Sequence, residues 1–391
     1  MNKLAWLEID LDAVAHNFNT VRKRVGEDIE ILCVVKADAY GHGACEVSRV
    51  LVDSGADRLG VATVDEGKQL RNSGFNVPIQ ILSATLPGQA REIVEYNLIP
   101  TVFTRDMASA LSHEAGLKNK KISVHLKVET GMGRIGVLSE DAVALACFIK
   151  DLPNLELEGV FTHFATASGP DYDYLNKQWN LFNDVLRELK SVGVNYHFSH
   201  VATSAVITDF PDMKLNMVRP GIMLYGMLPA PHMYHKLLLR PVLTLKARVV
   251  YVKKLTEDMT LSYDRTYLAP AGSVIATLPI GYADGYSRTL SNRGWVLLKG
   301  KQVPVVGRVC MDSILVDVTS IEEVRPGDEA VIIGKQKDRY ISVDDIAALM
   351  DTINYEVSTL LGKRYPRIFK RGGEIKEIRT LNGKYSPVNA V

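Results

Sequence analysis

The 391-residue chain has few cysteines, almost no net charge and no long apolar run. Its four cysteines are widely spaced and form no CxxC pair, which predicts reduced thiols rather than a disulfide or zinc framework. The formal net charge of +1 gives no reason to expect nucleic acid or an anionic membrane as a partner. No segment approaches the ~18 consecutive apolar residues that a membrane span needs. The first residues, MNKLAWLEIDLDAVAHNF, do not resemble a signal peptide, so we expect a cytoplasmic protein.

Eight short apolar runs alternate with amphipathic segments between about residue 30 and residue 225. The runs are ILCVVK, RLGVA, PIQIL, IPTVF, ISVHLKV, LEGVFTH, YHFSHV and NMVRPG. Patterns such as VDEGKQLRNSG and NKQWNLFNDVLRELKSVG between them are typical of helices. This alternation predicts a (β/α)8 barrel. An open doubly wound sheet is the alternative, but eight parallel strands without an obvious reversal of order favour a closed barrel.

The sequence pattern changes near residue 240. KARVVYVKKL, GSVIATLPIGY, WVLLKGKQVPVVG and EAVIIGK are typical of strands, and one late helix pattern, VDDIAALMDTINYEVSTLL, interrupts them. We therefore expect two domains, a barrel over residues 1–235 and a mostly β domain over residues 236–391. The early stretch WLEIDLDA predicts a strand that could belong to either unit, so residues 1–12 could be part of the β domain.

The stretch ISVHLKVETGMGRIG has the outline of a dinucleotide-binding turn. A predicted strand precedes Gly131-x-Gly133-x-x-Gly136, and a helix-like segment follows. Glu156 and Glu158 lie about 20 residues further on, where a ribose-binding acid is expected. A lone GxGxxG is weak evidence, so the rest of the chain has to decide its meaning.

Residues at the ends of barrel strands are the first candidates for catalysis. Lys36 ends the first strand within VVKADAYGHG, where desolvation lowers a lysine pKa from its usual ~10.4 towards a nucleophilic range. Such a lysine can bond covalently to a carbonyl compound. A lysine whose ammonium merely reaches the rim is the alternative. Tyr40, Gly41 and Gly43 follow at once and provide a phenol and a loop that can approach a ligand closely.

VVKADAYGHGA resembles the pyridoxal-phosphate signature of alanine racemases. The resemblance continues through WLEIDLDAVAHN, HLKVETGMGRIG, VRPGIMLYG, SYDRTY, GYADGYSR, VGRVCMD and INYEV, so it spans nearly the whole chain. It implies pyridoxal 5′-phosphate as the cofactor, an amino acid as the substrate, and a barrel followed by a β domain.

The resemblance gives the glycine-rich stretch a different meaning. In that family GMGRIG is a barrel loop whose important residue is Arg134, because a guanidinium binds the substrate carboxylate in bidentate form. Lys127 lies on the strand before it, and in many relatives the matching lysine carries a carbamate that orients this arginine. We therefore favour a substrate-binding loop over a dinucleotide turn.

The resemblance also assigns the cofactor site. His163 packs beside the pyridine ring, and Arg219 lies against the pyridine nitrogen. The residues assigned to the phosphate are Tyr40, Ser204, Gly221, Ile222 and Tyr355. Because an arginine does not readily give a proton to that nitrogen, the ring stays a weak electron sink and side reactions are suppressed.

Three histidines, His163, His197 and His200, raise the alternative of a metal-dependent barrel hydrolase in which Lys127 would be a carbamylated ligand. However, His197 and His200 are three residues apart, so on one strand they face opposite sides. No HxH ends the first strand either, and we expect no metal.

Racemisation removes a proton from one face of Cα and returns one to the other, which two opposed bases can do directly. Lys36 is one base, and the resemblance places the other at Tyr263, linked through His163 to Arg219. It implies that Tyr263 and Met311, whose amide meets the substrate carboxylate, enter from the other subunit of a head-to-tail homodimer.

Two positions depart from the pattern of the family: Thr203 stands where asparagine is common, and Asp264 where glycine is frequent. Neither removes a catalytic group. We therefore predict an enzyme that interconverts L- and D-alanine and supplies D-alanine for peptidoglycan. The alternatives are a racemase of serine or another small amino acid, a decarboxylase on the same barrel, and a non-catalytic cofactor carrier. A decarboxylase would need a glutamate-type partner where the chain has Arg219, and a carrier is usually a lone barrel.

Overall fold

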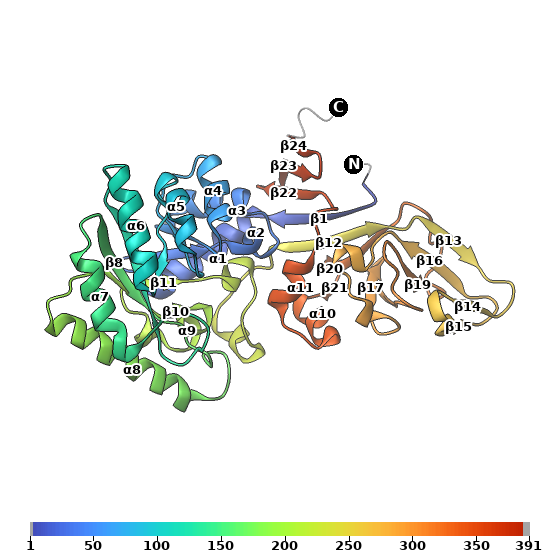
Figure 1. Ribbon diagram of the computed structural model, residues 1–391. Coiled ribbons are helices and arrows are strands. Elements are labelled where there is room, and N and C mark those ends of the chain that lie inside the picture. Colours follow the sequence, from blue (N-terminus) through green and yellow to red (C-terminus); the bar gives the residue numbers. More distant parts are fainter. Residues whose placement is uncertain (1–2, 386–391) are drawn as a thin grey trace. The chain divides into compact units, whose positions relative to one another are not determined.

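The computed structural model describes residues 3–385, and its internal contacts divide the chain into two compact units (Figure 1). The barrel unit contains Ala13–Ala39 and Ala44–Arg240. The β unit contains the chain up to Asp12, the short segment Tyr40–Gly43, and the chain from Pro241 onward. The boundary therefore crosses the VVKADAYGHG stretch, with Lys36 in the first unit and Tyr40 in the second.

Eight parallel strands form the barrel, and each coincides with one of the eight apolar runs. They are β2 (Glu30–Val34), β3 (Arg58–Val61), β4 (Ile79–Ile81), β5 (Thr101–Val102), β6 (Ile122–Glu129), β8 (Leu155–Phe161), β9 (Phe198–His200), which leads into β10 (Ala202–Thr203), and β11 (Met217–Arg219). The last strand pairs in parallel with the first, Met217 opposite Glu30. A parallel bridge between Gln80 and Ile99 joins the β4 and β5 segments. The predicted barrel is confirmed.

One helix precedes the first of these strands, and the others follow in the segments between them. The helices are α1 (Leu11–Val25), α2 (Lys36–Tyr40), α3 (Ala44–Asp53), α4 (Val64–Asn72), α5 (Ala90–Glu95), α6 (Arg105–Leu117), α7 (Ala142–Asp151), α8 (Tyr172–Ser191) and α9 (Ser204–Asp209). In α8 the buried residues recur every three or four positions, at Leu175, Gln178, Phe182, Val185 and Leu189. One face of this helix therefore packs inward while the other faces solvent.

The β unit is built on a nine-stranded sheet in which sequence-distant strands are neighbours. Its strands are β18 (Lys301–Pro304), β17 (Trp295–Leu298), β20 (Glu329–Gln336), β12 (Leu243–Arg248), β1 (Ala5–Asp10), β22 (Arg367–Arg371), β23 (Glu374–Thr380), β24 (Gly383–Tyr385) and β21 (Arg339–Ile341). The early strand β1 runs antiparallel to β12 and parallel to β22, as Figure 1 shows. Smaller sheets contain β13 (Tyr251–Lys254), β16 (Val274–Leu278) and β19 (Ile314–Asp317), and β14 (Met259–Leu261) with β15 (Tyr267–Ala269). The mostly β second domain is confirmed.

Two details of this unit differ from the sequence patterns. KARVVYVKKL contributes to two strands in different sheets, β12 and β13. The late helix pattern is two helices, α10 (Val343–Met350) and α11 (Asn354–Leu360), because Asp351 adopts a left-handed conformation with φ 56° that ends the first. Within residues 3–385 no helix has the length and apolar character needed to cross a membrane.

Candidate active site

Lys36 is followed by an unusual left-handed turn. Ala37, Asp38 and Ala39 have φ values of 52°, 53° and 54°, and Tyr40 has 53°. Such a conformation costs roughly 1–2 kcal/mol per non-glycine residue, so other contacts must hold it. Ala37 N donates to Glu66 Oε1 at 2.7 Å, and Ala44 N donates to Asp38 Oδ1 at 2.8 Å. No sequence pattern predicted this turn, since alanine has no left-handed preference and the preference of aspartate is much weaker than that of glycine.

The Lys36 amine lies in an electropositive environment. Burial lowers its pKa, the charges of Arg134 and Arg219 lower it further, and Glu66 partly offsets them. An amine with a lowered pKa is more often neutral and therefore nucleophilic. The structure thus gives Lys36 the property that the sequence predicted for a reactive lysine.

The glycine-rich loop after β6 already holds an anion of its own. The Glu129 carboxylate accepts hydrogen bonds from the backbone N–H groups of Gly131 at 2.5 Å, Met132 at 2.6 Å and Arg134 at 3.2 Å. Burial raises the Glu129 pKa, but these bonds outweigh it and the pKa is lowered. Because Glu129 occupies the amides that a pyrophosphate would need, the dinucleotide interpretation is wrong.

The second part of the dinucleotide interpretation is wrong as well. Helix α7 begins only at Ala142, after the short strand β7 (Val137–Leu138). Glu158, a candidate ribose ligand, instead forms a bidentate ion pair with Arg58 inside the barrel, with N–O distances of 3.1 and 2.8 Å. What remains of the motif is a loop that carries Arg134.

Lys127 is almost completely enclosed, at 2% exposed. Its Nζ lies 5.3 Å from the centre of the Phe161 ring and donates to Val128 O at 3.3 Å. Burial and the neighbouring Arg219 charge lower its pKa to about 7. A substantial share of this amine is therefore neutral near pH 7.

Arg219 is held by both of its terminal nitrogens. Nη1 donates to His200 O at 2.9 Å and lies 2.6 Å from His200 Nδ1, while Nη2 donates to Thr162 O at 2.9 Å. Burial lowers the pKa of Arg219 to about 9. Its Nε–H has no hydrogen-bond partner among residues 3–385, so this group is available to a ligand.

His163 lies at the same end of the barrel, with Nδ1 3.5 Å from Arg219 Nη2. Burial lowers its pKa well below the usual value, and the charges of Arg219, Lys127, Arg134 and Lys36 act in the same direction. These four cations and His163 therefore share one environment, which suits an anionic ligand.

Ser204 and the segment after β11 contain three of the residues that are predicted to bind the cofactor phosphate. Ser204 Oγ accepts from Gly221 N at 3.1 Å, so its own hydrogen remains free for a ligand. Within the described chain Ile222 N, at the start of the 3₁₀ helix Ile222–Tyr225, has no bonded partner either. The Gly221 amide, in contrast, is already occupied by Ser204. Thr203 makes no capping bond to α9.

In the β unit, Tyr40 and Tyr355 lie together, with ring centroids 5.9 Å apart. Burial raises the pKa of both phenols, so both keep their protons and can donate. Gly41 must be glycine here, because a Cβ would lie 2.2 Å from Ser358 O.

Tyr263 and Met311 are exposed on the β unit, at 67% and 52%. Tyr263 lies in a 3₁₀ turn rather than in a strand. Ser262, with φ 61°, donates to Arg308 O at 2.7 Å and lies 3.4 Å from Cys310 Sγ. The segments that carry Tyr263 and Met311 are therefore fixed to each other.

The structure shows how aspartate is accommodated at position 264, next to Tyr263, where glycine is frequent in the family. Its φ of 59° is a conformation that glycine adopts freely and that aspartate tolerates better than most residues. Its carboxylate lies 3.3 Å from Arg308 Nε and 3.6 Å from Arg288 Nη2. The turn is thus kept without glycine.

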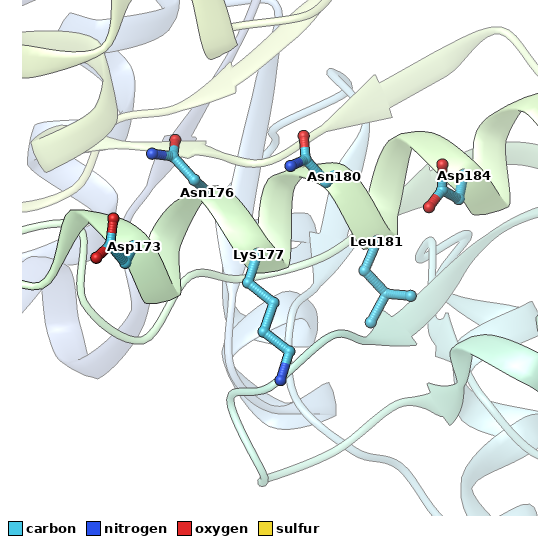
Figure 2. A pocket seen from close by; sticks show the side chains of 6 residues that line it. All are labelled: Asp173, Asn176, Lys177, Asn180, Leu181 and Asp184. Atoms are coloured by element: carbon cyan, nitrogen blue, oxygen red, sulfur yellow. The ribbon is translucent and has the colours of Figure 1, made fainter.

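The histidines that raised the alternative of a metal site do not come together. His197 is exposed and pairs with Glu156 at 3.5 Å, whereas His200 is fully buried, so the two face opposite sides. No group of three or more His, Cys, Asp and Glu residues that could hold a metal ion occurs within residues 3–385. Figure 2 shows a hollow on α8 whose side chains, Asp173, Asn176, Lys177, Asn180, Leu181 and Asp184, all come from one helix and do not converge.

Known proteins match both units. Residues 9–229 match the alanine racemase N-terminal domain, and residues 242–369 match the alanine racemase C-terminal domain. An alanine racemase of Halothermothrix orenii is 47% identical over 365 residues, which are 93% of this chain and 96% of that protein. The crystal structure of alanine racemase from Bacillus anthracis with bound L-Ala-P has a TM-score of 0.91 at 36% identity, covering 100% of both chains. A histidine racemase from Leuconostoc mesenteroides has a TM-score of 0.87 at 30% identity, covering 95% of this chain and 99% of that chain.

The fold, the site and these matches define an amino-acid racemase, an enzyme of the isomerase class. More narrowly, the chain belongs to the alanine racemase family, which confirms the resemblance seen in its motifs.

Proposed function

We propose that this enzyme interconverts L-alanine and D-alanine with pyridoxal 5′-phosphate as its cofactor. The observation that carries the proposal is Arg219, whose unpartnered Nε–H lies in the same electrostatic environment as the Lys36 amine. When bound, the cofactor supplies an electron-withdrawing ring that acidifies the Cα–H bond of an amino acid.

The residues of the chain fit this cofactor. The Lys36 amine would hold its aldehyde carbon, and Arg219 Nε–H would donate to its ring nitrogen, with His163 beside the ring. By resemblance to the family, the phosphate donors would be the Ser204 hydroxyl, the Ile222 amide, Tyr40 and Tyr355, with Gly221 keeping Ser204 in place. An arginine at the ring nitrogen would leave the ring a weak electron sink and so suppress side reactions such as transamination, whereas a decarboxylase on this barrel would need a glutamate-type partner there.

Two bases would exchange the proton at Cα. Lys36 would act on one face and the partner subunit's Tyr263 on the other, with His163 and Arg219 continuing a hydrogen-bonded chain from that phenol. The substrate carboxylate would bind Arg134 and the amide of the partner subunit's Met311. The exposure of Tyr263 and Met311 in the single chain, and the contacts that link their segments, support a homodimer with shared sites.

Lys127 would carry a carbamate that orients Arg134. Carbon dioxide adds to a neutral amine and a proton is released, so a lysine with a pKa of about 7 is suited to the reaction. The resulting anion would also offset the charges of Arg134 and Arg219, both of which lower the pKa of the uncarbamylated amine.

The substrate is proposed to be alanine, and the product D-alanine to serve peptidoglycan synthesis in the cytoplasm. Relatives that cover nearly the whole chain are alanine racemases, whereas one structural neighbour is a histidine racemase.

Circular dichroism of L-alanine, L-serine, L-lysine and L-histidine incubated with the purified holoenzyme tests this choice. We expect the L-alanine signal to decay to zero at least ten times faster than the others. A faster decay with another amino acid would replace the substrate, and release of carbon dioxide would identify a decarboxylase instead.

A further inference from the structure

A continuous chain of polar side chains runs down the barrel interior from Arg219, and all of its members as far as Arg58 are buried except the partly exposed Glu158. Arg219 Nη1 lies 2.6 Å from His200 Nδ1, His200 Nε2 lies 2.8 Å from His125 Nδ1, and His125 Nε2 lies 3.1 Å from Glu158 Oε2. Glu158 is bound in turn by Arg58, which also pairs with Glu30 at 3.3 Å. Arg58 and Glu30 are the first residues of β3 and β2, so the chain joins the two ends of the barrel.

Aromatic packing fixes the geometry of this chain. The Phe161 ring stacks on His200 at 4.6 Å with an interplanar angle of 5°, and Arg58 lies over the Phe198 ring at 4.3 Å. Gly159 leaves room for the other imidazole, because a Cβ there would lie 2.4 Å from His125 Cε1. Neither ring can therefore turn away from its hydrogen-bond partners without repacking the core.

The direction of every hydrogen bond follows from Glu158. An ionised carboxylate can only accept, so His125 Nε2 must carry a hydrogen. Burial raises the Glu158 pKa, but the bonds from His125 and Arg58 outweigh it and lower that pKa to about 2. Glu158 therefore stays ionised throughout the physiological range.

The same argument determines which ring nitrogen carries the hydrogen in both histidines. Burial lowers the pKa of His200, and it lowers the pKa of His125 despite the opposing charge and hydrogen bond of Glu158, so the neutral form with one hydrogen is favoured in both rings. With its hydrogen on Nε2, His125 accepts at Nδ1, and His200 Nε2 must donate to it. His200 Nδ1 is then an acceptor, which is what the guanidinium of Arg219 requires.

We propose that Glu158 is a positioning residue that sets the tautomers of His125 and His200 and thereby holds Arg219 with its Nε–H directed at its ligand. The tautomers follow from the barrel interior alone, whereas the effect on catalysis rests on the proposed function. A carboxylate several side chains away from the reacting atoms thus determines how the arginine is presented.

The neutral isostere Glu158→Gln tests the direction of the hydrogen bonds between Glu158 and Arg219. Its amide oxygen should accept from the cationic Arg58, which leaves the amide nitrogen to donate to His125. His125 must then accept at Nε2 and carry its hydrogen on Nδ1. His200 would in turn carry its hydrogen on Nδ1, so a donor and not an acceptor would face the N–H of Arg219. Glu158→Asp keeps the carboxylate and should keep the original tautomers. Glu156→Gln, on the same strand but exposed and paired with the exposed His197, is the matched control.

Long-range ¹H–¹⁵N spectra of the holoenzyme labelled with ¹⁵N-histidine report each tautomer. We expect Nε2–H forms of His125 and His200 in the wild type, in Glu158→Asp and in the control, and Nδ1–H forms in Glu158→Gln. Alanine racemisation by Glu158→Gln should lose about tenfold or more in kcat with less than a twofold change in KM, because Arg134 is untouched.

The outcomes separate the two proposals. Nδ1–H on either histidine in the wild type overturns the inference even if Glu158→Gln does not fold, as do unchanged tautomers in a folded Glu158→Gln. Unchanged kcat after a tautomer switch overturns the positioning role. A wild-type enzyme that shows the Nε2–H tautomers but does not racemise alanine would refute the proposed function and leave the tautomer assignment standing.

Discussion

Burial and crowding of cations change what single residues can do in this barrel. Lys36, Lys127 and Arg219 all have lowered pKa values, to about 7 for Lys127 and about 9 for Arg219. Desolvation disfavours each charge, and neighbouring cations add to the effect for both lysines. Lys127 therefore approaches neutrality near pH 7, the Lys36 pKa is shifted in the same direction, and Arg219 remains a charged donor. The same buried, cation-rich interior thus shifts the lysines towards nucleophiles and leaves the arginine a charged hydrogen-bond donor.

Lys36 should be the residue that holds the cofactor. We expect the purified protein to be yellow, and borohydride reduction to fix the cofactor to the peptide that contains Lys36. Peptide mapping by mass spectrometry provides the measurement, and Lys36→Ala should lose the label. Labelling of Lys127 instead would contradict the assignment.

Arg134→Ala should weaken transition-state binding of the substrate carboxylate. Loss of a hydrogen-bonded contact to a charged group costs about 1.5–3 kcal/mol, which is roughly a ten- to hundredfold or larger loss of kcat/KM. Arg187→Ala, on the exposed face of α8, is a control that should leave kcat/KM unchanged. Normal kinetics of Arg134→Ala would mean that the loop after β6 has another task.

At the scale of elements, the turn α2 and the loop after β6 are held by contacts from outside themselves. Left-handed conformations at Ala37 and Asp38 are stabilised by Glu66 and by the start of α3. In the loop after β6, the Glu129 carboxylate organises the amides that lead to Arg134. The turn at α2 is therefore strained by itself and depends on the distant Glu66, whereas the loop after β6 is fixed by a carboxylate close to it in sequence.

Ala37→Gly should raise the thermal unfolding midpoint slightly, by removing the left-handed penalty of about 1–2 kcal/mol against a glycine entropy cost of about 0.5–1 kcal/mol. Ala144→Gly, at an exposed position of the right-handed helix α7, is the matched control and should lower the midpoint. Both midpoints can be read from thermal denaturation of the holoenzyme. A fall of equal size in both variants would show that the turn at Ala37 carries no strain.

At the scale of the whole molecule, the proposed mechanism divides catalysis between two subunits. Lys36 belongs to the barrel unit, and Tyr263 and Met311 are exposed on the β unit. A closed twofold dimer would form two equivalent sites, each with residues from both subunits.

Mixing Lys36→Ala with Tyr263→Phe should restore activity that neither inactive variant has alone. In a mixed dimer both lesions fall in one site and the other site is wild type. Random exchange makes about half of the dimers mixed, so roughly a quarter of wild-type activity should return. Verified subunit exchange without recovered activity would show that Tyr263 acts within its own chain.

The sequence by itself determined the barrel, the β unit and the family, because these depend on local patterns. Eight apolar runs predicted the eight strands, and short motifs identified Lys36 and Arg134 as candidates. For GMGRIG the family motifs already favoured a substrate-binding loop, and the structure added that Glu129 occupies its amides. Tertiary structure alone showed the contacts of Glu158, which lies 33 positions from His125 and 100 from Arg58. Hydrophobic periodicity records which face of an element is buried. It does not record which polar side chains from distant strands meet inside, because that depends on barrel closure and strand register.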